Sequence, residues 1–337
     1  MMNTTNSRRR FLATSSGALA TIAIWPSGAR AAQFTYKFGS DNSSDNPLNV
    51  RMRAMWAAVK NETDGKLDVS VYPNNQLGGG AAMQAQLRTG ALQFLAQDAV
   101  ILSSVAPKAS ICGVGFAFND SKHAWEAMDG ELGNFVRNEI IAAGIFAFPR
   151  PWENGMRQVT TSTHPIASVG DVQGLKLRTP SGKLWLDLFA SLGASPTALS
   201  FAEVYTSLQT KIIDGQENPL SVIELSRLYE VQRYLSLTNH MWSGHWLVAN
   251  MDAWNGLPKD VQSVVTRNVD KYVSLQRQDL LAMNQSLQGQ LEKQGLKVNK
   301  TDRGSFKGKL GNFYQTWKGV FGDQGWSALE KYSGKLG

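Results

Sequence analysis

The stretch Gly174-Leu175-Lys176-Leu177-Arg178-Thr179-Pro180 decides the fold, because it predicts a strand that leads straight into a helix. Leu175 to Arg178 forms the predicted strand. Thr179-Pro180 then predicts an N-cap followed by proline at the first helical position, with the helix running to Leu192. A strand that ends in a charged residue and is followed by a helix is a unit of an α/β layer.

A second helix start follows a few residues later. Ser200-Phe201-Ala202-Glu203 has the S-x-x-E spacing of a capping box. The helix that it predicts carries Val204, Leu208 and Ile212 on one face.

Strand and helix signals also alternate toward the amino end, and no internal repeat interrupts them. The predicted strands are Phe34 to Phe38, Leu67 to Tyr72 and Gln158 to Thr161, and the predicted helices are Leu48 to Lys60 and Met83 to Leu92. The fold class is therefore α/β.

One predicted helix is much longer than the others. No glycine or proline occurs from Lys259 to Gln288, and apolar residues such as Val261, Val265 and Leu280 recur there at helical spacing. At 1.5 Å per residue the helix would be about 45 Å long. It could brace two domains or be an ordinary amphipathic surface helix, and the periodicity leaves both interpretations open.

The amino end predicts export. Arg8-Arg9-Arg10 precedes an apolar, alanine-rich run from Ala18 to Trp25, and Ala29-Arg30-Ala31 offers small residues for a signal peptidase. We interpret residues 1–31 as a twin-arginine (Tat) signal peptide that is cleaved near Ala31. The alternatives are a basic tail or a membrane anchor, although the run is shorter than the ~20 residues that span a bilayer.

Charge and cysteine content exclude several classes of protein. Residues 1–31 hold four arginines and no acid, so 30 basic residues remain against 27 acidic ones, a net charge of +3. So small a surplus, spread along the chain, predicts no nucleic-acid partner. The single Cys112 cannot form a disulfide within the chain, and its apolar surroundings predict a buried thiol.

Catalytic and metal-binding motifs are absent from the sequence. There is no G-x-S-x-G, P-loop, HExxH or paired CxxC, and Gly113-Val114-Gly115 lacks the third glycine of a dinucleotide fingerprint. His240 and His245 are spaced unsuitably for one helical face and have no third ligand nearby. We therefore expect no enzyme activity, no cofactor and no metal.

Five ordered motifs carry a resemblance to a known family. In chain order they are residues 153–161 (ENGMRQVTT), 174–180 (GLKLRTP), 192–196 (LGASP), 200–205 (SFAEVY) and 214–219 (DGQENP). Together they resemble the DctP-type substrate-binding proteins of TRAP transporters, the tripartite ATP-independent periplasmic carriers. The likeness extends over nearly the whole chain after residue 31.

The resemblance implies a two-lobed, type II-like periplasmic binding protein with discontinuous lobes, a hinge and a long bracing helix. Lobe I is expected to comprise 32–155 and 244–283, and lobe II 156–243 and 284–337. It also implies a periplasmic protein that binds a small organic acid and delivers it to a small and a large membrane subunit of the permease.

The resemblance also assigns ligand-binding roles, motif by motif. Arg178 matches the arginine that pairs with the substrate carboxylate, Arg157 a second basic contact, Asn218 an amide on the same carboxylate, and Phe201 a pocket wall. The remaining candidates are the residues at looser matches or beside the pocket: Asn42, Asp98, Trp152, Glu153, His240 and Trp242. Glu153 replaces an aromatic residue found in sialic-acid-binding members, which leaves the substrate open.

Physical chemistry supports the role of Arg178, since a guanidinium is always charged and pairs with a carboxylate through two parallel N–H donors. The competing interpretations are a surface salt bridge for Arg178, a helix cap for Asn218 and core positions for the tryptophans. If two of Trp152, Trp185, Trp242 and Trp246 face the cleft, a uronate, aromatic acid or 2-oxo acid fits better than a C4-dicarboxylate.

Three alternatives remain beside this hypothesis. The same scaffold could bind a C4-dicarboxylate, the chain could be a Tat-exported enzyme acting on a carboxylate substrate, or the binding protein could serve a sensor kinase instead of a transporter.

Overall fold

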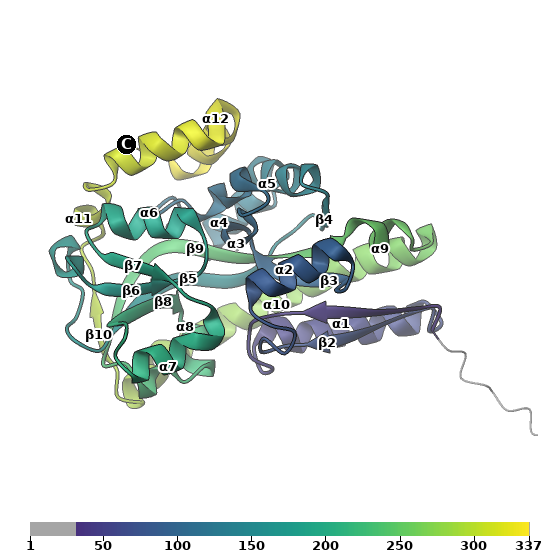
Figure 1. Ribbon diagram of the computed structural model, residues 1–337, viewed down its shortest axis with the longest axis horizontal. Helices are drawn as coiled ribbons and strands as arrows, with labels where there is room; N and C mark the ends of the chain where they lie inside the picture. Colours follow the sequence, from purple (N-terminus) through teal and green to yellow (C-terminus); the bar gives the residue numbers. More distant parts are fainter. Residues whose placement is uncertain (1–31, 337) are drawn as a thin grey trace, which may run out of the picture. The chain divides into compact units, whose positions relative to one another are not determined.

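The computed structural model describes residues 32–336, and the expected signal peptide and its cleavage site lie outside them. The described residues form one mixed sheet with helices on both sides (Figure 1). Its strands are β1 (Phe34–Gly39), β2 (Leu67–Tyr72), β3 (Phe94–Asp98), β4 (Ile145–Ala147), β5 (Trp152–Thr161), β6 (Lys176–Thr179), β7 (Ser195–Ala198), β8 (Gly215–Pro219), β9 (Tyr234–Asn250) and β10 (Lys297–Lys300).

The sheet consists of two parallel parts joined by two long antiparallel strands. The strand order is β2-β1-β3-β9-β5-β8-β6-β7. Strands β1 to β3 run parallel to one another, and so do β6 to β8. Strands β5 and β9 lie between these parts and pair with each other over most of the length of β5 (Figure 1). The carboxyl ends of both parallel parts therefore open toward the same central region.

The helices cover the sheet from both sides. They are α1 (Pro47–Glu62), α2 (Gly80–Thr89), α3 (Ala99–Leu102), α4 (Ser121–Met128), α5 (Glu131–Ala142), α6 (Lys183–Ser191), α7 (Val204–Gln209), α8 (Leu220–Leu225), α9 (Met251–Asn255), α10 (Lys259–Lys293), α11 (Arg303–Lys307) and α12 (Gly311–Ser333). The 3₁₀ segments are η1 (Pro107–Gly113), η2 (Val169–Val172), η3 (Phe201–Glu203) and η4 (Leu228–Glu230).

Helix α10 is the predicted long helix, and it extends five residues beyond the expected end, to Lys293. Its first half packs Val261 and Val265 into a core with α1, β1 and β3, whereas Leu291 near its end belongs to a second core with α7 and α8. One continuous helix thus contributes to two separate cores, which supports the bracing interpretation rather than that of a surface helix.

A third core contains the carboxyl-terminal helix. Trp317, Phe321 and Trp326 of α12 pack with η1, α5 and α6, and Cys112 is buried in the same cluster, as predicted. Helix α12 therefore rests on elements from both expected lobes.

Strand β5 is irregular where it approaches the centre of the molecule. Its pairing with β9 shifts register between Glu153 and Gly155 and again between Arg157 and Val159. Gly155 has φ +125°, and a Cβ atom there would lie 3.1 Å from the ring of Pro219. A side chain at this position would be both strained and crowded, so glycine permits the bulge.

Two local predictions around the deciding stretch were wrong. Helix α6 begins at Lys183 after Gly182, not at Pro180, because Thr179 still belongs to β6 and the chain needs three more residues to turn. Ile212 is 66% exposed, since α7 ends at Gln209 before that position is reached. The capping box is confirmed: Ser200 and Glu203 make both reciprocal hydrogen bonds.

Candidate functional site

A cavity of about 300 Å³ lies where the strand ends of both parallel parts meet. A volume of this size suits a small ligand, since protein pockets for small molecules begin at about 300 Å³. The cavity is lined by residues that follow β1, β2, β3, β6, β7 and β8 and by residues of β5 and β9: Asp41, Asn42, Gly79, Gly80, Ala81, Ala82, Asp98, Ile101, Asn154, Arg157, Arg178, Pro180, Ser181, Trp185, Leu199, Ser200, Phe201, Asn218, Val222, Ser243 and His245.

Arg178 lines this cavity from the end of β6 and is only 2% exposed. Its Nε and Nη2 atoms donate to the carbonyl oxygen of Leu199 at 3.0 and 2.7 Å, and its charge lies 5.7 Å from the centre of the Phe201 ring. The Nη1 atom is buried and has no hydrogen-bond partner among the described residues. Two contacts fix the guanidinium, and one nitrogen remains free for an acceptor.

Burial lowers the pKa of Arg178 to about 10, with Glu217 and Asp41 acting in the opposite direction. The guanidinium is still charged at neutral pH. Since a buried charge without a full set of partners is costly, an anion bound at Nη1 would be strongly favoured.

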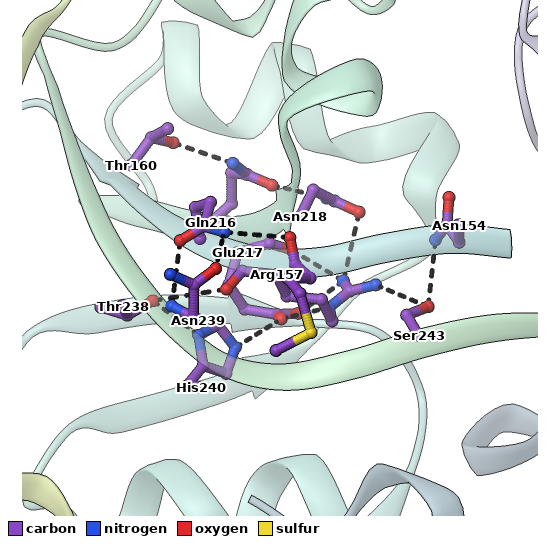
Figure 2. A network of polar contacts seen from close by, with 12 residues as sticks. Asn154, Arg157, Thr160, Gln216, Glu217, Asn218, Thr238, Asn239, His240 and Ser243 are labelled. Carbon is purple, nitrogen blue, oxygen red and sulfur yellow. Dashed lines mark hydrogen bonds and ion pairs between the residues drawn. The ribbon is translucent and has the colours of Figure 1, made fainter. Parts of the chain in front are cut away.

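Arg157 is as buried as Arg178, 2% exposed, and is already paired within the protein (Figure 2). Its Nε atom donates to Glu217 Oε2, and its Nη2 atom donates to Glu217 Oε1 at 2.8 Å and to Asn218 Oδ1 at 3.1 Å. Its Nη1 atom makes one long contact, 3.3 Å, to Ser243 Oγ. Arg157 therefore offers a ligand at most its Nη1 edge, while its charge is balanced by Glu217.

The Glu217 carboxylate also contacts His240, whose Nε2 atom lies 3.0 Å from Oε2. Burial raises the pKa of Glu217, but Arg157 and His240 together lower it by more than burial raises it. The net shift of the Glu217 pKa is therefore downward. Burial lowers the pKa of His240 despite Glu217. A charged carboxylate and a neutral imidazole result, with Thr238 Oγ1 2.7 Å from His240 Nδ1 (Figure 2).

Asn218 lines the cavity, but both polar atoms of its side-chain amide already form hydrogen bonds within the protein. Its Oδ1 atom accepts from Arg157, and its Nδ2 atom donates to Gln216 Oε1 at 2.6 Å. The cap interpretation is wrong, because Asn218 makes no capping hydrogen bond to α8, which has Pro219 at its N-cap.

The opposite wall is polar and acidic. It contains Asp41 and Asn42 after β1, Asp98 at the end of β3, and His245 on β9, which pairs in register with Asp98. Asp98 accepts from the Val100 backbone N–H at 2.8 Å and from Ser243 Oγ at 2.6 Å. Burial raises the pKa of Asp98 and of Asp41.

His245 supplies a free donor to this wall. Asn42 Nδ2 lies 3.3 Å from His245 Nε2, and since an amide nitrogen only donates, this assigns the imidazole proton to Nδ1. Nδ1 is buried and has no partner among the described residues. Burial lowers the pKa of His245 to about 4, so the ring is neutral near pH 7.

Six of the ten candidate residues line the cavity: Asn42, Asp98, Arg157, Arg178, Phe201 and Asn218. The other four are buried outside its lining. Glu153 accepts hydrogen bonds from Ser121, Trp125 and Trp242, so Trp242 is turned toward Glu153. His240 lies against Glu217, and Trp152 is fully buried in the core beside α10.

The tryptophans do not favour a ring-bearing ligand, because fewer than two of them face the cavity. Of the four tryptophans considered, Trp185 alone lines the cavity, with its ring 5.1 Å from the Arg157 guanidinium. Trp152, Trp242 and Trp246 occupy core positions.

The lining residues that were not predicted as site residues include Asp41, His245, Asn154 and Ser243. A signal existed for Asp41, which lies just after a predicted strand, as Arg178 lies at the end of one. No signal existed for His245 and Ser243, because their place in the cavity depends on the register of β9 with β3 and β5.

Within residues 32–336, no group of three or more histidine, cysteine, aspartate or glutamate side chains is arranged to hold a metal ion. None of the helices in this part of the chain has the length and apolar character needed to cross a membrane.

Fold and cavity together define a binding protein for a small anionic molecule, with strand ends from the two parallel parts of the sheet meeting at one site that holds two buried arginines. The chain belongs to the bacterial extracellular solute-binding proteins, family 7 (DctP), whose family model matches residues 38–319. This is a family of solute-binding transport proteins, not of enzymes.

Named relatives differ in their ligands. The chain is 30% identical over 295 residues to the 2,3-diketo-L-gulonate-binding periplasmic protein YiaO of Escherichia coli, covering 87% of this chain and 89% of the relative. It is 31% identical over 258 residues to the C4-dicarboxylate-binding protein DctP of Rhodobacter capsulatus, covering 76% of each. The chain is also 36% identical over 259 residues to protein y4mM of Sinorhizobium fredii. This match covers 76% of this chain but only about half, 48%, of y4mM.

A solved structure confirms the two-lobed α/β fold. The TRAP periplasmic solute-binding protein of Polaromonas sp. JS666, bound to D-erythronate, superposes with a TM-score of 0.85 at 28% identity and covers 90% of this chain and 99% of its own.

Proposed function

We propose that this protein binds a small organic acid between two lobes and delivers it to the membrane subunits of a TRAP transporter. The observation that carries the proposal is the buried guanidinium of Arg178, which lines the cavity, is fixed by the Leu199 carbonyl and has no hydrogen-bond partner for Nη1 among the described residues. A ligand carboxylate at Nη1 would supply the missing acceptor and a directly bonded counter-charge.

The other lining residues support the carboxylate from two sides. Arg157 contributes a second positive charge through its Nη1 edge, although Glu217 balances most of it. Asn218 holds Arg157 in place, and the Phe201 ring closes the cavity above Arg178. Four candidate residues are buried outside the cavity lining and fix the strands that carry these groups: Glu153, Trp152, His240 and Trp242.

Binding is coupled to closure of the lobes, for which we keep the boundaries 32–155 with 244–283 and 156–243 with 284–337. Asp41, Asn42 and Asp98 belong to the first lobe, and Arg178 and Phe201 to the second. A ligand that contacts both sets of residues stabilises the closed state relative to the open one. The closed surface is then recognised by the small and large permease subunits.

Relatives bind organic acids in the periplasm, which supports the same compartment for this chain. We propose export through the Tat pathway with cleavage near Ala31, on the basis of the arginine pair and the alanines at 29 and 31. Amino-terminal sequencing of the protein from a periplasmic extract tests this, and an intact amino end refutes it.

Native mass spectrometry of the freshly purified protein and isothermal titration test the binding function. Arg178→Ala should weaken acid binding at least tenfold, because a charge-assisted hydrogen bond contributes about 1.5–3 kcal/mol. Arg178→Lys keeps a charge but loses the planar fork, so it should also bind poorly. Arg88→Ala, at an exposed arginine, is the matched control. Unaltered affinity in both Arg178 variants would remove this residue from its role, and conversion of a bound acid into a product would favour an enzyme.

A further inference from the structure

The charge balance of the cavity limits how many carboxylates its ligand can carry. Two guanidiniums line it, those of Arg157 and Arg178, and His245 is neutral. Glu217 takes both Nε and Nη2 of Arg157, which leaves the free Nη1 of Arg178 as the principal anion contact among the lining residues. One ligand carboxylate therefore finds an uncompensated cationic partner, whereas a second one finds only the Nη1 edge of Arg157, whose charge Glu217 already balances.

The cavity wall that follows β1 and β3 would act against a second carboxylate. Asp41 and Asp98 line it, and their oxygens only accept hydrogen bonds when ionised. Asp98 is 5% exposed and is held by Val100 and Ser243, so it cannot turn away into solvent. Like charges brought together in a buried site repel strongly, because little water screens them.

The same wall is suited to hydroxyl groups. It offers acceptors at Asp41 and Asp98, and the lining residue His245 carries a donor at Nδ1 that is buried and lacks a partner among the described residues. A hydroxyl both donates and accepts, so neighbouring hydroxyls can satisfy both kinds of group, whereas a carboxylate or a ketone only accepts. Buried polar groups of this kind require partners, which a hydroxylated ligand provides.

An apolar side completes the cavity. Trp185, Phe201, Ile101 and Val222 line it next to the polar wall. A polyhydroxylated carbon chain has C–H groups as well as hydroxyls, so it can pack one side on these rings and side chains while its hydroxyls face the acids.

Starting from the proposed binding function, we infer that the ligand is a polyhydroxylated monocarboxylic acid of the aldonate or uronate class, and that Asp41 and Asp98 exclude dicarboxylates. The carboxylate lies on Arg178, and the hydroxyls lie against Asp41, Asp98 and His245. The relatives do not decide this, since one is named for a C4-dicarboxylate and another for a diketo-gulonate.

Matched acid pairs test this inference by titration calorimetry. D-Galactonate and galactarate share their internal hydroxyls and differ at one end, where galactarate has a second carboxylate; D-erythronate and meso-tartrate are the corresponding four-carbon pair. We expect each monocarboxylate to bind at least a hundredfold tighter than its dicarboxylate partner. Equal or tighter binding of the dicarboxylates, or of an amino acid in place of the hydroxy acids, overturns the inference.

Asp41→Asn then tests the residues. The Asp41 side chain accepts no hydrogen bond from another described side chain, and His245 Nε2 lies 3.8 Å away, so the variant should fold normally. It should reduce the ratio between galactonate and galactarate at least tenfold. Asp98→Asn should do the same, since asparagine also caps α3. Asp323→Asn, at an exposed site, is the control. An unchanged ratio in both cavity variants contradicts the proposal.

The outcomes separate this inference from the binding function on which it rests. Tight binding of dicarboxylates that is lost in Arg178→Ala would leave the solute-binding function standing and refute the selectivity. Failure of every acid in the panel to bind would refute both.

Discussion

Replacing Glu217 by glutamine should destabilise the protein by about 3–5 kcal/mol, the usual cost of removing one partner of a buried ion pair. The side chains of Arg157 and Glu217 are 3% and 0% exposed. The carboxylate accepts from two nitrogens of Arg157 and lies 3.0 Å from His240 Nε2. Glutamine keeps the volume but leaves a buried guanidinium without its counter-charge.

This loss is large relative to the free energy of unfolding of the whole protein, which is typically about 5–15 kcal/mol for a domain. Replacing both partners, in the double variant Arg157→Met with Glu217→Leu, should cost far less than the single change. A buried pair exchanged for apolar side chains of similar volume is often close to neutral. The double variant should nevertheless bind acids more weakly than the wild type, because the cavity loses the Nη1 edge of Arg157.

Urea denaturation of the ligand-free protein, followed by circular dichroism, measures these free energies. Glu126→Gln removes an exposed carboxylate and is the matched control. A single variant that loses less than about 1 kcal/mol, or a double variant less stable than the single one, would refute the assignment of Glu217 as the essential counter-charge of Arg157.

The pH dependence follows from the same pair. The folded-state pKa of Glu217 is depressed, so its stabilising contribution is present above the unfolded value of about 4.3 and is lost as pH falls through the folded value. The wild type should therefore lose more stability than Glu217→Gln between pH 5 and pH 3. Parallel pH profiles of the two proteins would contradict the downward shift.

Two further predictions concern the irregular part of β5. Gln276→Leu should destabilise the protein by about 2–4 kcal/mol in urea denaturation, because the Gln276 amide pairs with both the N–H and the carbonyl of Glu153; Gln285→Leu, on the exposed face of α10, should change little. Gly155→Ala should lower the melting temperature by an amount equivalent to about 1–3 kcal/mol, because φ is +125° and Pro219 is close. Gly289→Ala on α10 is the control: a Cβ atom there would lie in open space, so this change should stabilise the protein by about 0.5–1 kcal/mol. If Gly155→Ala also stabilises the protein, the bulge tolerates a side chain.

Much of the fold could be predicted from the sequence because its signals are local. The strand Leu67 to Tyr72 has the predicted bounds, and the long helix begins at Lys259 behind Pro258, as expected. Apolar periodicity and capping residues act within a few positions, so one sequence reveals them. The start of α6 was misplaced because Thr179-Pro180 is a good cap locally, yet pairing of Arg178 and Thr179 with β7 extends the strand through it.

The site was predictable only in part, for a physical reason. Arg178 stands at a strand end beside a family motif, so its place in the cavity follows from the local sequence and the parallel topology. His245 lies opposite Asp98 only because β3 and β9 pair in one register, and a shift of one residue would turn it to the other face. Trp242 and Glu153 were placed near the ligand, but they satisfy each other by a hydrogen bond of 2.8 Å.

The position of Ser243 explains how the two halves of the cavity are held to each other. Its hydroxyl donates to Asp98 Oδ2 and accepts from Asn154 Nδ2 and Arg157 Nη1, so one oxygen joins an acid that ends β3 to a guanidinium on β5. The Ser243 hydroxyl has one hydrogen. It can accept hydrogen bonds from both the arginine and the amide only while that hydrogen is donated to Asp98. The acid that selects against a second ligand carboxylate is thus also the group that fixes the free edge of Arg157, and selectivity and charge placement in this cavity depend on the same residue.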